Sequence, residues 1–575
     1  MAAEAETEHS LQGSDSEKKE AWEEIEAPVS AARDREGDNS EKQYEAIRTN
    51  TRTGSQRPHP APLRQTRSRS SARSHRSYDG YTVDDRDHDG TNEEESSKNE
   101  FEVQFDGDSD PMDPKNRPEA RKWLVVFIVS AGSLCVTCAS SLYTSTYDQM
   151  EVEFGVSRLV ATIGLTTYVV GLGLGPMFLS PLSEFYGRRN IYICAFGMFL
   201  IWLIPCAVAP NIATMLVARF FDGLAGSAFL SVAGGTVGDM FTKDKLSAPM
   251  MIYTASPFMG PEVGPLIGGF INQFADWRWS FYVLIIWAGI QWILIVAFVP
   301  ETYAPVLLRR KAMMLRKEKN DDRWKAPIEI MDRSITQTVL WSCIRPFQLL
   351  CFETMVLLLC LLSAILLGIL YLFFGAFALV FQNNHGFNQW QTGLSFLGIL
   401  VGMLIGVSCD PLWRRNYIRL VDKNDGISEP EFRLPPTILG AVLVPGLDGR
   451  LLAVFIGLRQ SSSADSSDSG TYSASAEFLP FSLRRWVITI ANEGLYVDDQ
   501  EYPLYAASAL AANSFARSSF AAAFPLFGVQ MYNHMGYQWA SSLLAFIALA
   551  MVPFPYLFFK HGKQLRAKSR YAQSK

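Results

Sequence analysis

Long apolar runs separated by short polar loops fill the chain from residue 123 onward. Each run holds about 20 residues without the alternation of a β-strand, the length that an α-helix needs to cross a hydrocarbon core. The pattern predicts eleven membrane-spanning helices in two groups, divided by a polar stretch over 301–350. They cover 123–145, 158–180, 190–210, 213–236, 249–272 and 279–299, then 352–381, 391–411, 434–458, 504–530 and 537–559.

Loop charge predicts the orientation of these helices. Lysine and arginine gather in every second loop, beginning with Arg121 and Lys122 before the first span, so those loops and both termini should be cytoplasmic. The loop after the first span carries Asp148, Glu151 and Glu153, which fits the outer side. Termini on one side require an even number of spans, and eleven is odd.

The odd number of predicted spans results from residues 446–502. Asp448, Gly449 and Arg450 interrupt the ninth span, a serine-rich run of low complexity follows, and 478–490 is too short and too charged to span a membrane. We expect that the tenth span is missing or replaced here. One explanation is a translated intron or local frame change in the gene model, and the other is a real variant with a disrupted C-terminal half.

Polar residues concentrate before the first span. Residues 1–120 hold 29 acidic and 17 basic side chains, a charge of −12, whereas the rest of the chain carries +6. With few apolar residues, this segment should be a disordered cytoplasmic tail. Serines among the arginines of 48–76 are candidate kinase sites. The remaining predicted parts are an N-terminal six-helix bundle (121–300), a central cytoplasmic loop (301–350), a C-terminal helical bundle (351–565) and a cytoplasmic C-terminus (566–575).

Composition excludes several classes of protein. The apolar runs rule out a soluble enzyme, and eight scattered cysteines do not form a disulfide framework. Cys135 and Cys138 form a C-x-x-C pair inside an apolar run without a second pair, so we expect no metal site. A nucleotide-binding G-x-x-x-x-G-K-S/T loop is not found, which argues against ATP-driven transport. The prediction is an all-α integral membrane protein that is not an enzyme and has no cofactor.

One acidic and basic pattern occurs twice. Glu184 is followed at the fourth and fifth positions by Arg188 and Arg189, and Asp410 is followed in the same way by Arg414 and Arg415. Each pattern lies at the cytoplasmic end of the second span of its group. Parallel repeats around a central site are typical of transporters that work by rocking two halves.

Three motifs in the first group carry a family resemblance. The loop motif SEFYGRR contains Glu184, Arg188 and Arg189, the fourth-span motif ARFFDGLAG contains Arg219, and the fifth span reads PFMGPEVGPLIGGF. On these motifs the chain resembles the major facilitator superfamily over about 111–445 and 503–565. It is most similar to the fungal twelve-span drug:proton antiporter family, in its polyamine and multidrug-resistance branch.

The resemblance implies a major facilitator fold of two six-helix halves (6+6). It also implies that the loop motif latches one conformation and that Arg219 takes part in proton coupling. The fifth-span motif is expected to bend its helix, seal it against leak and distinguish antiporters from symporters. Its residues are Gly260, Pro261, Gly264, Pro265, Gly268 and Gly269. A generic packing face of small residues is the alternative for the glycines.

The residues themselves add further candidates. Asp222 lies three residues after Arg219 on the same helical face, so it is the nearest partner and a candidate titrating acid. Glu262, inside the fifth-span motif, is a candidate coupling acid or cation site. The alternative for Arg219 is a position near the membrane surface, where its side chain would snorkel.

Aromatic and polar side chains suggest a substrate cavity. Tyr143, Tyr371 and Phe374 could bind amphipathic cations by cation–π contact, with Asn513 as a polar partner. Contact with lipid or with other helices is the alternative for each of them.

The sequence therefore predicts a proton-coupled antiporter that exports drugs, toxins or polyamine-like cations by alternating access. Its expected partners are a small-molecule substrate, protons and the lipid bilayer, with no nucleic acid and no metal, and we expect a monomer. The plasma membrane is the expected location and the vacuolar membrane the alternative. The competing hypotheses are a non-transporting or defective membrane paralogue or sensor, and a proton-coupled nutrient symporter.

Overall fold

The computed structural model describes residues 101–107, 110–242, 245–330, 335–384, 386–424 and 506–568, with five positions between 432 and 439. The predicted tail up to residue 100, the segment 446–502 and most of the ninth predicted span lie outside these residues. The absence of a tenth span therefore stays a prediction.

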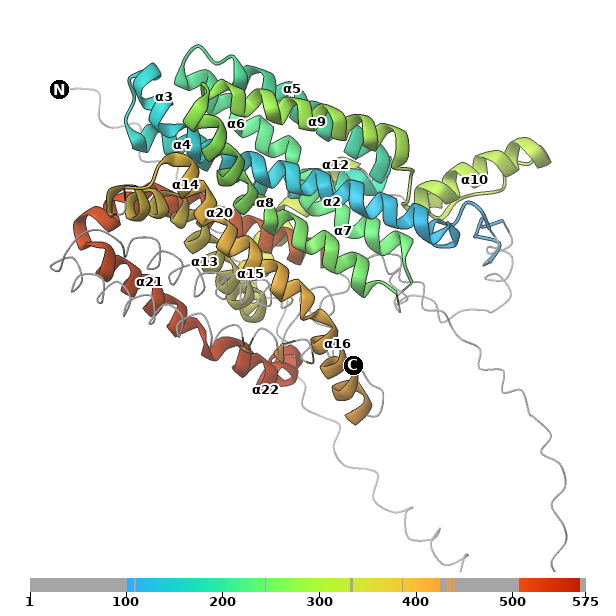
Figure 1. The fold of residues 1–575 in the computed structure, drawn as a ribbon. Helices are drawn as coiled ribbons and strands as arrows, with labels where there is room; N and C mark the ends of the chain where they lie inside the picture. Colours follow the sequence, from blue (N-terminus) through green and yellow to red (C-terminus); the bar gives the residue numbers. More distant parts are fainter. Residues whose placement is uncertain are drawn as a thin grey trace, which may run out of the picture. The chain divides into compact units, whose positions relative to one another are not determined.

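The first group of spans is helical as predicted (Figure 1). The first span continues beyond its predicted end, because a short 3-10 turn, η2, joins α2 to α3. The fourth span is divided into α6 and α7. The elements are α2 Glu119–Leu142, η2 Tyr143–Thr146, α3 Tyr147–Phe154, α4 Arg158–Tyr186, α5 Arg188–Ala207, α6 Ile212–Gly226, α7 Ala228–Met240, α8 Ser247–Phe274 and α9 Arg278–Phe298.

The predicted central loop is largely helical. It contains α10 Ala304–Lys319, α11 Pro327–Ile330 and α12 Ile335–Phe352. The second group follows as α13 Thr354–Phe377, a π-helical turn η3 Ala378–Asn384, α14 Gln389–Ser395, α15 Leu397–Ser408, α16 Asp410–Lys423, α20 Ala506–Met535, α21 Tyr537–Met551 and α22 Pro553–Lys568. Within the described part of the chain, the only β-type pairing is a single bridge between Glu102 and Lys325. The all-α prediction is confirmed.

Seven helices among the described residues are long and apolar enough to cross a membrane. Helices α8 and α20, of 28 and 30 residues, have the length but not the hydropathy. Glycine, proline, serine and asparagine interrupt their apolar residues. Such residues allow close helix contacts in membranes, so these two helices are suited to the interior of the bundle.

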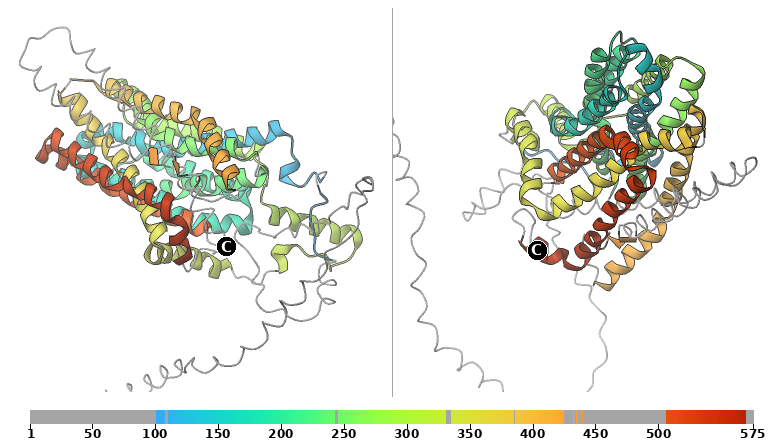
Figure 2. Two further views of the ribbon diagram at one scale, coloured as in Figure 1. Left: turned by 90° about the horizontal axis from the view of Figure 1, so that it is seen from below. Right: turned by 90° about the vertical axis from the view of Figure 1, so that its left-hand side faces the viewer.

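Close contacts join the two groups of helices. Helix α8 packs on α2 within the first group and on α14 and α15 of the second, and α4 packs on α20. One cluster of buried apolar side chains runs through both groups. Figure 2 shows the red α20 beside the yellow α13, with which it makes its most extensive contact. Residues far apart in the sequence thereby meet at the centre of the bundle.

Candidate functional site

Arg219 lies on α6 in the interior of the first group, with none of its side chain exposed. Its Nη2 donates a hydrogen bond to the backbone oxygen of Ala139 on α2, at 3.1 Å. The guanidinium carbon lies 4.6 Å from the ring centre of Tyr143 and 4.1 Å from that of Tyr168. A guanidinium enclosed by a carbonyl and two rings is an internal charge, so the snorkelling alternative does not fit.

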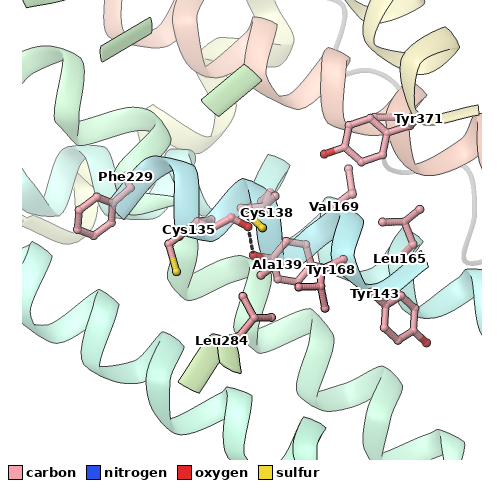
Figure 3. Packing of buried hydrophobic residues seen from close by; sticks show 14 of the residues in the cluster. Cys135, Cys138, Ala139, Tyr143, Leu165, Tyr168, Val169, Phe229, Leu284 and Tyr371 are labelled. Carbon is pink, nitrogen blue, oxygen red and sulfur yellow. Dashed lines mark hydrogen bonds between the residues drawn. The ribbon is translucent and has the colours of Figure 1, made fainter. Parts of the chain in front are cut away.

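The two tyrosines are fixed by hydrogen bonds of their own. Tyr168 on α4 donates to the backbone oxygen of Val136 at 2.7 Å, and Tyr143 donates to that of Ala161 at 3.0 Å. Figure 3 shows both rings beside α2, with Cys135, Cys138 and Ala139 on that helix. A Cβ atom on Gly223 would lie 2.1 Å from the backbone oxygen of Tyr168, so only glycine lets α6 approach α4 this closely.

Asp222 is the acid that faces Arg219. It is fully buried, and one carboxylate oxygen lies 3.6 Å from Nη1 of Arg219. Within the part of the chain that the structure describes, neither carboxylate oxygen accepts a hydrogen bond. A buried carboxylate without hydrogen bonds is costly unless a counter-charge compensates it. The predicted partnership is present, and the charge of Asp222 depends on Arg219.

The loop motif after α4 forms a second cluster of charges. Nε of Arg188 lies 3.4 Å from the carboxylate of Asp239 on α7, and Nη1 donates to Ser183 at 2.7 Å. Arg189 donates to the backbone oxygen of Val296 at 3.0 Å, and Glu184 is half-buried. Arg188 is thus bound to the end of the fourth span within its own group.

Glu301 completes this cluster from the loop after α9. One carboxylate oxygen accepts from the backbone N–H of Arg188 at 2.9 Å, and the other accepts from that of Arg189 at 3.3 Å. The first oxygen also accepts from Thr302 and Tyr303, each at 3.1 Å. The carboxylate therefore caps the N-terminus of α5, where the helix leaves its N–H groups unpaired and favours negative charge.

Sequence reasoning did not select Asp239 or Glu301 as site residues. They lie in the stretches GGTVGDMF and VPETYAPVLLRRKA, within the range 111–445 over which the chain resembles the family. The signal that could have identified them is a charged residue within a stretch that resembles the family.

The glycines of the fifth-span motif form a packing face on α8. Added Cβ atoms at Gly260 and Gly264 would lie 2.0 Å and 1.9 Å from Thr137 and Ser141 on α2, and Gly268 faces Ser145 at 2.8 Å. Gly269 instead faces the second group, where its Cβ would lie 2.8 Å from the backbone oxygen of Gln389. Pro261 and Pro265 lie within the helix. The packing interpretation and the family motif thus describe the same residues.

The two remaining candidate acids are Glu262 and Asp410. Glu262 on α8 is 1% exposed, so it is buried inside the bundle, as expected of a coupling acid. Asp410 is the first residue of α16, and its side chain lies outside the description.

The candidate substrate residues are all buried in packing contacts. The hydroxyl of Tyr371 on α13 lies 3.1 Å from Ser140 Oγ on α2, while Phe374 packs on Phe396 at 5.7 Å between ring centres. Asn513 accepts a hydrogen bond from Ser363 at 2.5 Å. Tyr143, as described above, packs on Arg219. Among the contacts of the described residues, Tyr371 is the one of the four that bridges the two groups of helices through a hydrogen bond.

Comparison with known proteins identifies the family. Residues 129–421 match the model of the Major Facilitator Superfamily. The chain belongs to this superfamily. It is 50% identical to Efflux pump atB of Aspergillus terreus, over 83% of this chain and 91% of that protein. It is 37% identical to the Saccharomyces cerevisiae protein named "Probable drug/proton antiporter YHK8", over the same two shares of 83% and 91%.

Solved structures agree on the major facilitator fold. The proton:xylose symporter XylE, 15% identical, matches with a TM-score of 0.52 over 77% of this chain and all but 3% of its own. Family membership and the efflux-pump relatives confirm the predicted resemblance. The chain is a membrane transporter and not an enzyme.

The two halves of this major facilitator protein also meet at the side that loop charge places outside. Nε2 of Gln389, at the start of α14, donates to Asp148 at 2.8 Å, and its backbone N–H donates to Gln273 at 3.2 Å. Phe270 and Trp390 pack beside them, with ring centres 5.8 Å apart. A polar pocket of about 400 Å³ lies here, lined by Asn272, Gln273, Gln382, Phe387, Asn388 and Gln389.

Glu301→Gln is expected to destabilise this transporter. The amide would turn one NH₂ group toward backbone N–H donors and remove the charge that caps α5, a loss of about 1.5–3 kcal/mol for a charged hydrogen bond. Thermal unfolding of the purified protein in detergent measures this as a lower melting temperature. Glu318→Gln is the matched control, because Glu318 is exposed on α10. Equal melting temperatures for the two variants would contradict the capping role.

Proposed function

We propose that this transporter exports drug-like organic compounds in exchange for protons, by alternating access between its two halves. The observation that carries the proposal is the fully buried Arg219–Asp222 pair. An ionisable pair inside a membrane bundle is costly and is commonly part of an ion or proton pathway. Relatives named efflux pump and drug/proton antiporter support the same activity.

In this proposal, Asp222 carries the proton. When Asp222 is ionised, Arg219 compensates its charge and holds α6 as described. When Asp222 is protonated, the attraction disappears and the guanidinium keeps only Ala139 and the two tyrosine rings. The two protonation states then favour different packing of α6, α2 and α4, which biases an equilibrium between two conformations. Glu262 is the second proposed coupling acid.

The contacts between the halves fit a conformation of this cycle that is closed at the proposed outer side. Gln389, with Asp148 and Gln273, joins the halves at the proposed outer side. These hydrogen bonds must break when that side opens. The Arg188–Asp239 and Glu301 contacts hold the proposed cytoplasmic end of the N-terminal half.

We also propose that the protein works in the plasma membrane as a monomer, driven by the proton gradient without another cofactor. Tyr371 and Phe374 are proposed to contact the substrate once the halves separate, because Tyr371 is hydrogen-bonded to the other half and Phe374 packs against Tyr371, with ring centres 5.1 Å apart. Polyamine-like cations stay a prediction, and the efflux-pump relatives favour export over nutrient uptake.

The test is efflux from cells that express the protein. We expect loss of a preloaded fluorescent organic cation to depend on the pH gradient and to stop when a protonophore collapses it. Glu262→Gln should slow efflux more than about tenfold, within the range of a 1–3 kcal/mol coupling free energy. Glu318→Gln serves again as the control. Gradient-independent efflux would contradict antiport, and no efflux of any test compound would favour a non-transporting paralogue.

A further inference from the structure

Residues 101–107 and 110–117, which precede α2, lie against the central loop between the two halves (Figure 1). The N–H of Val103 donates to the backbone oxygen of Lys325 at 3.0 Å, and the N–H of Lys325 donates to that of Phe101 at 3.0 Å. These two bonds form the parallel bridge between Glu102 and Lys325. The sequence assigned 1–120 to a disordered tail, whereas residues 101–107 and 110–117 have a defined structure.

Apolar side chains close this contact. Val103 is 2% exposed and forms a small buried cluster with Leu308 and Ala312 of α10 and with Ala326. Phe101 packs edge-on against Trp324, with ring centres 5.6 Å apart. The cluster is separate from the main core of the bundle. Val103 is one of its four buried members, so undocking of residues 101–105 would expose part of this cluster.

Charges hold the next part of the segment. Lys311 of α10 lies 2.7 Å from the carboxylate of Asp106 and 2.6 Å from that of Asp110. Burial alone would raise the pKa of Asp110, but the hydrogen bond from Lys311 and those from the N–H groups of Asp106 and Met112 lower it overall. Burial alone would lower the pKa of Lys311, but its two acidic partners raise it. Both groups therefore stay charged at neutral pH.

The far end of the segment reaches the charge cluster described above. Nη2 of Arg117 donates to the backbone oxygen of Glu301 at 2.9 Å. Asn116 donates to the backbone oxygens of Gly107 and Asp110, so the segment also folds on itself. Glu301 in turn caps α5 at Arg188. A continuous set of contacts thus runs from Val103 through α10 and Glu301 to the loop motif.

We propose that residues 101–107 and 110–117 act as a strap, whose docking on α10 keeps Glu301 on the N-terminus of α5. Undocking of the strap loosens the Glu301 cap and slows transport. The transport part rests on the proposed function, whereas the effect on the cap does not. Because Lys311 and Asp110 stay charged at neutral pH, changes of cytoplasmic pH near neutrality should not undock the strap. Substitutions in the strap or in its contact residues on α10 should undock it.

Hydrogen–deuterium exchange of the full chain in nanodiscs, read by mass spectrometry, tests the effect on the cap. The amides of Arg188 and Arg189 report on Glu301, and those of Val103 and Lys325 report on docking. Val103→Asp and Lys311→Ala should raise exchange at all four amides by about tenfold or more, a rate ratio that corresponds to 1.4 kcal/mol of local opening. Lys317→Ala is the matched control, because Lys317 is exposed on the same helix.

Truncations give a second measurement that does not depend on one substitution. Removal of residues 2–100 leaves the strap, and removal of residues 2–110 deletes its docking contacts. We expect the shorter deletion to keep wild-type exchange and efflux. The longer deletion should raise exchange at Arg188 and lower efflux at least about threefold, a modest coupling between distant sites.

The outcomes separate the strap from the proposed function. Unchanged exchange at Arg188 and Arg189 in both Val103→Asp and the longer deletion would overturn the strap proposal. Raised exchange there with wild-type efflux would overturn its effect on transport. Raised exchange in a chain that shows no gradient-driven efflux would support the effect on the cap and contradict the proposed function instead.

Discussion

Arg219→Ala is expected to abolish proton-coupled efflux and to destabilise the transporter. The substitution removes the only cation within 4.0 Å of Asp222 among the described residues. It leaves a fully buried carboxylate without compensation. Breaking a buried ion pair on one side costs about 3–5 kcal/mol, because the remaining charge is not solvated. Efflux assays and thermal unfolding in detergent measure the two effects.

A double substitution separates coupling from stability. Arg219→Ala with Asp222→Asn removes both charges, so it should recover much of the lost melting temperature. We expect no recovery of efflux, since neither the proposed proton carrier Asp222 nor its counter-charge Arg219 remains. Arg219→Lys keeps the charge but lacks the planar group that lies against Tyr143 and Tyr168. Its efflux rate and melting temperature should lie between those of the wild type and of Arg219→Ala. Normal gradient-driven efflux by the double variant would show that the pair is only structural.

The sequence predicted the parts of the fold that depend on local pattern. Apolar runs of spanning length locate the helices, and the spacing of Arg219 and Asp222 on one helical face predicts their contact, since both depend on residues close in the chain. The glycine spacing of α8 likewise predicts a face for close packing. Which helix that face contacts does not follow from spacing, and the structure places α2 against Gly260 and Gly264.

Contacts between distant segments were not predictable in the same way. Glu301 reaches Arg188 across 113 positions, and Val103 meets Lys325 across a still longer separation. No periodic pattern links such residues. The alternation of Phe101, Val103 and Phe105 is a weak strand-like signal inside an acidic segment, and composition outweighed it. The proposed substrate-contact residues could not be ranked from the sequence either. Tyr143 and Tyr371 look alike in sequence, but of these two described residues Tyr371 is the one with a hydrogen bond to the other half.

Gly264→Ala is expected to prevent correct assembly of the N-terminal half. The added Cβ would lie 1.9 Å from Oγ of Ser141, 2.7 Å from the backbone nitrogen of Leu142 and 2.8 Å from the backbone oxygen of Cys138. The serine side chain could rotate away, but two backbone atoms of α2 cannot move without separating the helices. Separation would also break the hydrogen bond from Ser141 to the oxygen of Gly260. We expect little monodisperse protein by size-exclusion chromatography and no efflux.

A glycine-to-alanine substitution in α9 should instead increase stability. A Cβ on Gly289 meets no atom within 4 Å. Gly289→Ala should therefore stabilise its helix by up to about 1 kcal/mol, the difference in helix propensity, and leave efflux unchanged. Adding Ser141→Gly to Gly264→Ala relieves only the side-chain clash, so it should restore little. Full recovery in that double variant would mean that α8 and α2 are less closely packed than these distances require, and the sealing role of the glycine motif would lose its basis.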